Sequence, residues 1–254
     1  MPAFQRFVAI GDSQTEGVGD PYPDGLERGW ADRFATVLGE RSPGLLYANL
    51  AVRGRRIAEV HDQQLGPALA LEPDLVSVMA GANDLIRPRL DLDRTLALMA
   101  DMQASFAATG ATILTNTYPI AEGSGPFGRG ATDRFRAFNQ GLREIAAESG
   151  ALLLDLEPIA SAADPRLWAA DRLHLNSEGH ARLAAGVLSL IGEAEPEWDA
   201  ELPSSHRRHP ALRARDDLDW AVRYLLPWVG RRLTGRSSGD GRFAKRPNLG
   251  PPPA

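Results

Sequence analysis

The sequence contains no cysteine and almost no lysine, and each absence removes a kind of chemistry. Without thiols the chain forms no disulfide, no thiolate nucleophile and no cysteine-ligated zinc site, although its redox compartment stays undetermined. Lys245 is the only lysine. The phosphate-binding pattern Gly-x-x-x-x-Gly-Lys-Ser/Thr is therefore missing, which argues against a nucleotide-binding module built on the glycine turn at residues 17–19.

Long hydrophobic runs and an excess of basic residues are also missing. No apolar stretch reaches about 18 residues, and the chain does not open with a basic region followed by a long apolar one, so neither a membrane span nor a secretory signal is predicted. We expect a cytoplasmic protein. The formal net charge of -5 and the absence of long like-charge runs argue against a nucleic-acid partner. The hydrophobic share of 43% is typical of an ordinary soluble globular protein.

Short β-rich runs alternate with stretches of helical periodicity through most of the chain. Strands are predicted at residues 7–10, 45–50, 75–80, 111–117 and 152–156. Helices are predicted at residues 30–38, 57–69, 92–108, 132–149 and 176–191. The second helix is expected to stop near Pro67, and residues 118–130 form the longest loop. Strict alternation of this kind predicts an α/β fold with a doubly wound, mostly parallel sheet.

A change of composition near Glu193 predicts two units, a domain of residues 1–194 and a C-terminal extension of residues 195–254. The extension has eight acidic and eleven basic residues, a net charge of +3, which leaves -8 for the domain. Beyond Gly235 the extension is rich in glycine, serine and proline and is expected to be disordered. We expect its removal to lower stability while leaving the chemistry largely intact.

An amphipathic helix is predicted within the extension from four apolar residues at helical spacing, Leu218, Val222, Leu225 and Val229. Pro227 should break or restart this helix. We expect the apolar stripe to dock on the domain. Binding to an anionic membrane is the alternative. The net positive charge of the extension favours it, and three neighbouring acidic residues, Asp216, Asp217 and Asp219, oppose it.

Polar residues follow several of the predicted strands at the point where each ends. Ser13 comes directly after the run 7–10, and the carboxyl ends of strands in an open α/β sheet face the ligand crevice, so Ser13 is a candidate nucleophile. A turn residue or helix N-cap is the simpler reading of Ser13 alone. Residues 49–54, 81–84 and 171–174 should lie at the same edge. His174 alone would be read as a structural histidine, but the joint placement favours a shared site.

These stretches occur in the order found in the SGNH hydrolases, the GDSL-type esterases and lipases, and the chain resembles that family. Gly11-Asp12-Ser13 matches the nucleophile block, Gly54 the glycine block, Gly-Ala-Asn-Asp at 81–84 the asparagine block, and Asp-Arg-Leu-His at 171–174 the acid–base block. The sequence departs at Gln14, where the family has leucine, and we expect this to alter only local packing. The resemblance covers residues 7 to about 191.

The resemblance implies a flavodoxin-like, three-layer α/β/α fold without a metal or other cofactor. It also implies hydrolysis of small-molecule esters, thioesters or acylated sugars and lipids. Serine needs an adjacent base, and that base needs a partner that fixes its tautomer, so Ser13, His174 and Asp171 are the expected nucleophile, base and orienting acid. The oxyanion hole is expected to comprise the N–H groups of Ser13 and Gly54 and the side-chain amide of Asn83.

Other charged residues near these blocks have simpler interpretations. Asp12 and Asp84 are expected to hold the loops by turn-type hydrogen bonds. Three arginines flank Gly54: Arg53, Arg55 and Arg56. We expect them to form a solvated helix start, and recognition of an anionic substrate group is the alternative.

Two other functions remain open from the sequence. A metal-dependent phosphoesterase would use oxygen and nitrogen ligands drawn from the same blocks, Asp12, Asn83, Asp84 and His174. Because only one histidine ligand is available there, this alternative is weaker than the serine hydrolase. A non-catalytic protein that binds carbohydrate or lipid is also compatible with the fold, although the intact serine, aspartate and histidine set argues against it. The sequence gives no oligomeric state.

Overall fold

The sheet at the centre of the molecule has the strand order β5-β4-β3-β1-β2-β6. The computed structural model describes residues 4–87, 89–120, 129–193, 197–203, 210–234 and 236–253. Its strands are β1 (Arg6–Gly11), β2 (Leu46–Asn49), β3 (Leu75–Met79), β4 (Thr112–Asn116), β5 (Leu152–Leu154) and β6 (Arg246–Gly250). Strands β1 to β5 are parallel and lie where the sequence predicts them. The predicted α/β fold with a doubly wound, mostly parallel sheet is confirmed.

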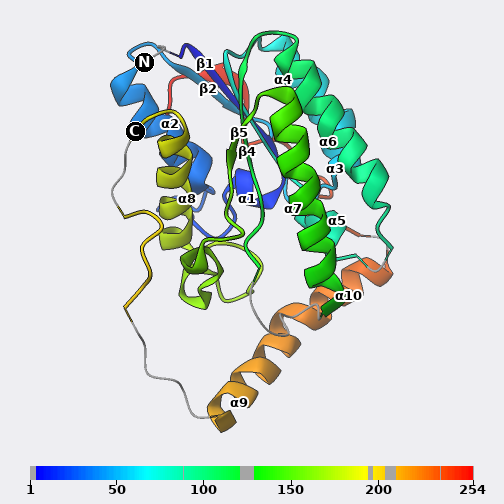
Figure 1. The fold of residues 1–254 in the computed structure, drawn as a ribbon. Coiled ribbons are helices and arrows are strands. Elements are labelled where there is room, and N and C mark those ends of the chain that lie inside the picture. Colours follow the sequence, from blue (N-terminus) through cyan, green and yellow to red (C-terminus); the bar gives the residue numbers. More distant parts are fainter. Residues whose placement is uncertain are drawn as a thin grey trace.

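Helices cover both faces of this sheet and give it three layers (Figure 1). One face packs against α2 (Gly29–Arg41) and α8 (Ser177–Leu190), and the other against α3 (Ile57–Val60), α4 (Gly66–Ala70), α6 (Leu92–Ala107) and α7 (Arg129–Ser149). In β1, Phe7 and Ala9 are buried in one core while Val8 and Ile10 are buried in the other. A central parallel strand is apolar throughout because both of its faces are covered.

Two prolines lie in the first turn of an α-helix that follows a π-helical turn. Pro67 does not stop its helical segment as expected, whereas Pro227 stands where the helix restarts, as the sequence allowed. The second predicted helix continues to Ala70, because a π-helical turn, His61–Leu65, joins α3 to α4 just before Pro67. Likewise α9 (Pro210–Trp220) continues through a π-helical turn, Ala221–Leu225, into α10 (Leu226–Leu233), which contains Pro227. Proline lacks an N–H and crowds the carbonyl one turn earlier. A π-helical turn just before the proline is wider than an α-helical turn, so it accommodates both the missing N–H donor and the crowded carbonyl.

The expectation of disorder beyond Gly235 is wrong for residues 236–253, which we call the C-terminal strap. Its strand β6 pairs antiparallel with β2 and completes the edge of the sheet. An edge strand tolerates Pro247 because one side of the strand needs no hydrogen-bond donor. The composition of this segment is typical of a disordered linker, and β6 is a strand because it pairs with β2. The division into a domain of residues 1–194 and an extension from residue 195 stays a prediction.

The helical part of the extension contacts the domain through Trp220, while the predicted stripe is exposed at Leu218 and Val222 and half-buried at Leu225 and Val229. Leu218 and Val222 are 68% and 56% exposed, whereas Trp220 is buried against the domain. The π-helical turn shifts the register of the helix, so residues four apart no longer share one face along its whole length. This segment runs past the end of the sheet at which α1 (Ser13–Glu16) lies (Figure 1).

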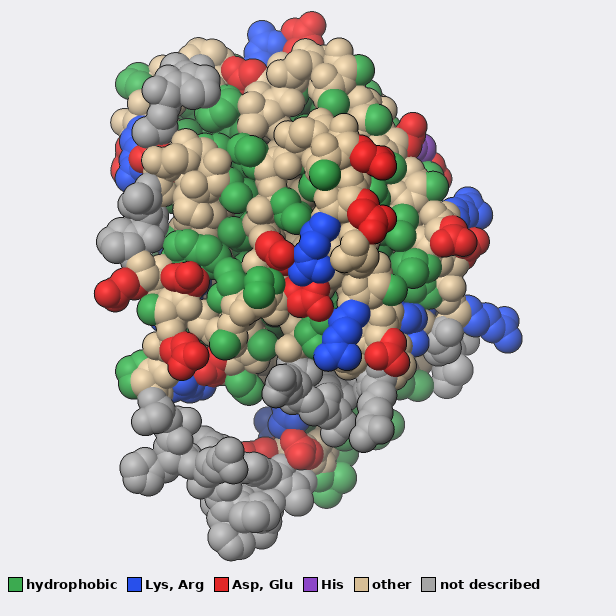
Figure 2. Space-filling model, in the orientation of Figure 1, with side chains coloured by type: hydrophobic (Ala, Val, Ile, Leu, Met, Phe, Trp, Pro, Cys, Tyr) green, Lys and Arg blue, Asp and Glu red, His purple; other side chains and the backbone are tan. Residues whose placement is uncertain are grey.

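Two further features concern the surface and the long loop. Acidic and basic side chains are interspersed with neutral ones on the face drawn in Figure 2. Among the described residues no helix has both the length and the apolar character needed to cross a membrane. The predicted loop at 118–130 ends at Arg129, where α7 begins, and its residues 121–128 lie outside the described part of the chain.

Candidate active site

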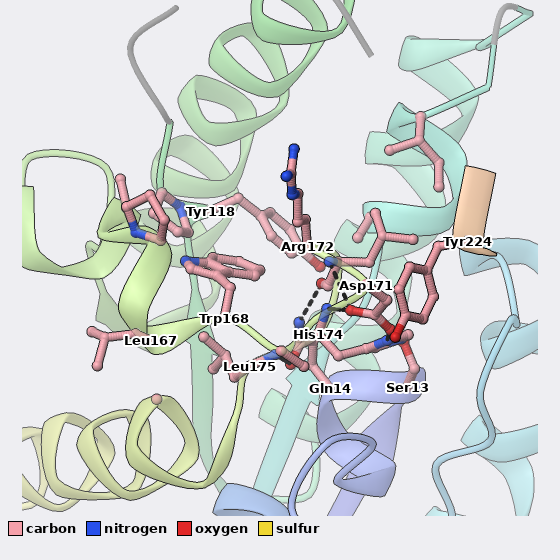
Figure 3. A pocket seen from close by; sticks show the side chains of 18 of the residues that line it. Ser13, Gln14, Tyr118, Leu167, Trp168, Asp171, Arg172, His174, Leu175 and Tyr224 are labelled. Carbon is pink, nitrogen blue, oxygen red and sulfur yellow. Dashed lines mark hydrogen bonds and ion pairs between the residues drawn. The ribbon is translucent and has the colours of Figure 1, made fainter. Parts of the chain in front are cut away.

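A cavity of about 1430 Å³ opens at the carboxyl ends of the strands, and all five of the predicted site residues line it: Ser13, Gly54, Asn83, Asp171 and His174. The residues come from four separate segments of the chain. Figure 3 shows Ser13, Asp171 and His174 together, with Tyr224 of the extension directed toward the same opening. The sequence therefore predicted correctly which segments meet.

Ser13 is the first residue of α1, and the turn before it explains its position. A Cβ at Gly11 would clash with the carbonyl oxygen of Met79 on the neighbouring strand, so glycine is needed where β1 ends. Asp12 then caps α1, because its Oδ1 accepts a hydrogen bond from the N–H of Gln14 at 3.3 Å. Ser13 is only 8% exposed, and its accessible surface faces the cavity.

His174 and Asp171 form a short hydrogen-bonded pair on one loop. The distance from His174 Nδ1 to Asp171 Oδ2 is 2.6 Å, and Asp171 Oδ1 accepts hydrogen bonds from the N–H groups of Leu173 and His174 at 3.0 and 3.1 Å. Burial alone would raise the pKa of Asp171, but the hydrogen bond and charge of His174 and the two N–H groups lower it below its ordinary value. Asp171 is therefore held as a carboxylate, and Nε2 is the imidazole nitrogen left for other partners.

No acceptor within the described part of the chain engages the N–H groups of Ser13 and Gly54, and both residues line the cavity. Gly54 has a φ of 77°, a left-handed conformation that favours glycine. Free N–H groups that converge on a cavity can stabilise a negative oxygen. Between the described residues no hydrogen bond joins the Ser13 hydroxyl to His174, a contact that commonly tightens only when substrate is bound.

The side chain of Asn83 is engaged with protein groups. Its Nδ2 donates to Asp12 Oδ2 at 3.2 Å and to the carbonyl of Arg55 at 3.1 Å. Burial raises the pKa of Asp12 to about 6, although the Gln14 N–H, the charge of His174 and the Asn83 amide counteract this. Asn83 thus links the residue before the nucleophile to the loop that carries Gly54. An oxyanion would have to take one of these two donated hydrogens.

The remaining charged residues of the motif blocks have structural partners. Asp84 Oδ2 accepts a hydrogen bond from the N–H of Ile57 at 2.9 Å, as expected for a loop-holding carboxylate. Arg53 pairs with Glu27 and with Glu16, where the distance from Nη2 to Oε1 is 2.5 Å. Arg55 and Arg56 both pair with Glu59 at the start of α3, Arg55 Nη1 to Oε1 at 3.0 Å and Arg56 Nε to Oε2 at 3.3 Å. The pairs with Glu59 favour the helix-start interpretation for Arg55 and Arg56. Arg53 departs from it, because its largely buried side chain pairs with two carboxylates outside α3.

Gln14 does more than the local packing that the sequence suggested. Its Nε2 donates to the carbonyl of Leu173 at 3.0 Å, and its Oε1 accepts from the N–H of Leu175 at 3.3 Å. These two residues flank His174. The departure from the family pattern therefore joins the helix of the nucleophile to the loop of the base.

The C-terminal extension is the part of the site that sequence reasoning missed. Trp220 Nε1 donates to the carbonyl of Asp171 at 2.8 Å, Arg172 pairs with Asp217 at 2.7 Å, and its guanidinium lies 5.2 Å from the Trp220 ring centre. Tyr224 and Trp228 line the cavity. The one signal in the sequence was the set of three aromatic residues in this helix.

The metal-binding alternative lacks a ligand cluster. Within the described residues, no three histidine, aspartate or glutamate side chains are grouped so that they could hold a metal ion. Asp12 and Asp84 are both raised in pKa by burial and are engaged by donors of the protein. These partners fit loop-holding carboxylates better than metal ligands.

Comparison with known structures gives the same fold. The α/β hydrolase LAE5 from the metagenome of Lake Arreo, Spain, has a TM-score of 0.63 and 22% identity, over 75% of this chain and 96% of its own. A catalytic mutant of Axe2, an acetylxylan esterase from Geobacillus stearothermophilus, has a TM-score of 0.64 and 21% identity over 76% and 97%. TesA has a TM-score of 0.62 and 21% identity over 74% and 98%. At these identities the likeness concerns the fold.

A search among curated proteins found no relative that matches. The model of the GDSL-like lipase/acylhydrolase family matches residues 9–182, a span that starts within β1 and reaches into α8. It contains the nucleophile, glycine, asparagine and acid–base blocks in order. Since the match covers more than half of the chain and the fold agrees, this protein belongs to the GDSL-like lipase/acylhydrolase family and is a hydrolase of ester bonds.

Proposed function

We propose that this chain is a serine esterase that cleaves carboxylic esters through an acyl-enzyme, with Ser13 as nucleophile, His174 as base and Asp171 as its orienting partner. The observation that carries the proposal is the 2.6 Å hydrogen bond from His174 Nδ1 to Asp171 Oδ2, in the cavity that Ser13 lines. Because Nδ1 is committed to the carboxylate, Nε2 is the nitrogen that receives the serine proton.

In the first half of the reaction, Ser13 Oγ attacks the ester carbonyl carbon while its proton passes to His174 Nε2. The carbonyl oxygen becomes an oxyanion, which the N–H groups of Ser13 and Gly54 stabilise. Asn83 contributes when its amide turns a hydrogen from Asp12 toward this oxygen. The intermediate collapses, the bond to the alcohol breaks, and the alcohol leaves with the proton from His174. The serine is left acylated.

The second half repeats these steps with water. His174 Nε2 takes a proton from water, the resulting hydroxide attacks the acyl carbonyl, and the same donors stabilise the second oxyanion. The bond to Ser13 Oγ then breaks, and the serine recovers its proton from His174. Asp171 stabilises the imidazolium in both halves, and its lowered pKa keeps it ionised for this role.

The dimensions of the cavity favour a substrate with one bulky part. Its volume of about 1430 Å³ exceeds the roughly 300–1,000 Å³ of pockets that hold drug-sized ligands. Tyr118 and Trp168 of the domain and Tyr224 and Trp228 of the extension line it. Flat aromatic faces suit an acyl chain, a sugar ring or an aryl group. We infer that esters bulky on one side are preferred over short esters of small alcohols.

A hydrolysis panel tests this proposal. It compares p-nitrophenyl esters of increasing chain length, acyl thioesters, lysophospholipids and acetylated xylo-oligosaccharides, since Axe2 is described as an acetyl-xylooligosaccharide esterase. We expect a higher kcat/KM for bulky esters than for p-nitrophenyl acetate, and the loss of all activity in Ser13→Ala. If the folded protein hydrolysed none of these esters, the proposal that it is an esterase would be refuted. A preference for the smallest ester would refute the inferred substrate class.

A further inference from the structure

The C-terminal strap folds back onto the loop that carries Gly54. We propose that the strap positions the Gly54 N–H for the oxyanion, through the packing of Gly239 against the peptide that links Arg53 to Gly54. The proposal rests on the proposed ester hydrolysis and assigns Gly239 and Ser237 as positioning residues for that reaction. It gives the segment after residue 235 a part in the chemistry.

The strap is anchored next to this loop by strand pairing and by buried charge. β6 pairs with β2, and β2 ends at Asn49, shortly before Gly54. Lys245 Nζ lies 2.7 Å from Asp32 Oδ1 and donates to the carbonyls of Glu27 and Arg28 at 2.9 and 2.7 Å. Asp32 is fully buried. A buried ion pair with these extra hydrogen bonds holds the strap in one register.

Gly239 touches the peptide group that presents the proposed oxyanion donor. Gly239 is buried, and a Cβ added to it would clash with the carbonyl oxygen of Arg53. That carbonyl and the Gly54 N–H belong to one planar, trans peptide, so they point in opposite directions. Any atom that pushes the Arg53 oxygen therefore rotates the Gly54 N–H. The absence of a side chain at position 239 lets the strap support this peptide without displacing it.

Ser237 holds the next peptide of the same loop. Its hydroxyl donates to the carbonyl of Gly54 at 3.3 Å and accepts from the N–H of Gly239 at 3.2 Å. A Cβ at Gly54 would meet the hydroxyls of Ser237 and Ser238, the latter at 2.7 Å. Gly54 is thus required both by its φ of 77° and by the close approach of the strap.

Other segments hold the opposite sides of the loop. The N–H of Arg53 donates to Glu16 Oε2 at 2.5 Å, and Asn83 Nδ2 donates to the carbonyl of Arg55 at 3.1 Å. The strap closes the remaining side. Three chain segments remote from one another in the sequence therefore fix the orientation of one catalytic donor, and a misplacement near 1 Å in such a group can cost about a hundredfold in rate.

The test compares two alanine substitutions within the strap. Gly239→Ala places a methyl group against the Arg53 carbonyl, whereas at Gly250 an added Cβ meets nothing within 4 Å. We expect Gly239→Ala to lower kcat by about tenfold to a hundredfold with KM little changed. The affinity for a boronate that forms a tetrahedral adduct on Ser13 should fall in parallel, because it uses the same donors. Gly250→Ala should retain wild-type values.

A second variant covers the case in which Gly239→Ala does not fold. Ser237→Ala should lower kcat several-fold, and Ser237→Thr, which keeps the hydroxyl, should restore it. If Gly239→Ala folds and has the same kcat and the same boronate affinity as the wild type and Gly250→Ala, the proposal is overturned. Wild-type kcat in Ser237→Ala would also overturn it.

A readout that does not need activity separates this proposal from the proposed function. The NMR resonance of the Gly54 amide should move in Gly239→Ala and stay in place in Gly250→Ala. An unmoved Gly54 resonance in Gly239→Ala would overturn the role of the strap, even if the wild-type enzyme hydrolyses esters. A wild-type protein that hydrolyses no ester would instead overturn the proposed esterase function.

Discussion

At the scale of single residues, Gln14 joins the helix of the proposed nucleophile to the loop of the proposed base. It bonds to the residues on both sides of His174 from a position next to Ser13. Gln14→Leu introduces the residue typical of the family and removes both hydrogen bonds. At roughly 1 kcal/mol for each bond, we expect kcat to fall by up to about thirtyfold. Steady-state kinetics check this, with Gln140→Leu as control, because the exposed Gln140 side chain bonds, among the described residues, only to Glu144. Wild-type kcat in Gln14→Leu would show that these bonds do not position the loop.

Asp12 predicts a pH dependence of stability with a definite sign. Its folded pKa of about 6 lies above the ordinary 3.8, so the folded protein binds this proton more tightly than the unfolded chain. The stability it contributes is complete below about pH 4 and is lost as pH rises through about 6. Asp12→Asn removes that loss. Its free energy of unfolding relative to wild type should therefore increase by roughly 2 kcal/mol between about pH 4 and pH 7. Urea titrations at both pH values measure it, and parallel pH profiles would contradict the burial of an ionisable Asp12.

At the scale of elements, α9 contacts the acid–base loop through Trp220. The indole N–H donates to the carbonyl of Asp171, and the ring lies against the Arg172 guanidinium. Trp220→Phe keeps an aromatic ring and removes the donor, so we expect a loss of about 1 kcal/mol in stability and a several-fold lower kcat. Leu218→Ala changes an exposed side chain of the same helix that does not line the cavity, and it should leave kcat near wild type. Equal kinetics for the two variants would show that α9 does not support the loop.

The sequence predicted the elements that depend on local pattern and missed those that depend on distant neighbours. The five parallel strands were evident because each is an apolar run bounded by turn residues. The continuation of the helix past Pro67 was missed, because the π-helical turns that precede Pro67 and Pro227 leave no mark in the hydrophobic pattern. The strand Arg246–Gly250 was missed because its composition resembles a linker, and it is a strand only through pairing with β2.

The same distinction applies to the site. The motif blocks predicted which side chains meet, including the contact between Asp171 and His174 from a spacing of three residues. They did not predict that both hydrogens of the Asn83 amide are already donated, nor that Gln14 and Trp220 hold the acid–base loop. Such contacts join residues far apart in the sequence, and a single sequence carries no signal for them.

At the scale of the whole molecule, the strap makes the two ends of the chain interdependent. The side chain of Lys245 is 14% exposed and pairs with Asp32 of α2, and desolvation lowers the pKa of its ammonium group despite the carboxylate. Lys245→Met leaves Asp32 with Arg246 as its remaining cation. Breaking a buried pair costs about 3 kcal/mol, so we expect a loss of this order in the free energy of unfolding. Chemical denaturation checks it, with the exposed Arg242→Met as control. An unchanged unfolding midpoint would mean that the strap contributes little to stability.

The strap also alters the expectation for truncation. The sequence suggested that removal of the extension would spare the chemistry, but the extension lines the cavity and contacts both the Gly54 loop and the Asp171 loop. The catalytic machinery of this chain is therefore spread over nearly its whole length. In the proposed mechanism the central component is still the hydroxyl of Ser13.

The measurement that tests this account most directly is the reaction of the full chain with a fluorophosphonate, followed by intact mass and peptide mass spectrometry. We expect one phosphonyl group per chain, attached to Ser13, and ester hydrolysis that falls in proportion to labelling. Ser13→Ala should stay folded, unlabelled and inactive. A label on another residue, or full ester hydrolysis by Ser13→Ala, would contradict the assignment of Ser13 as the nucleophile.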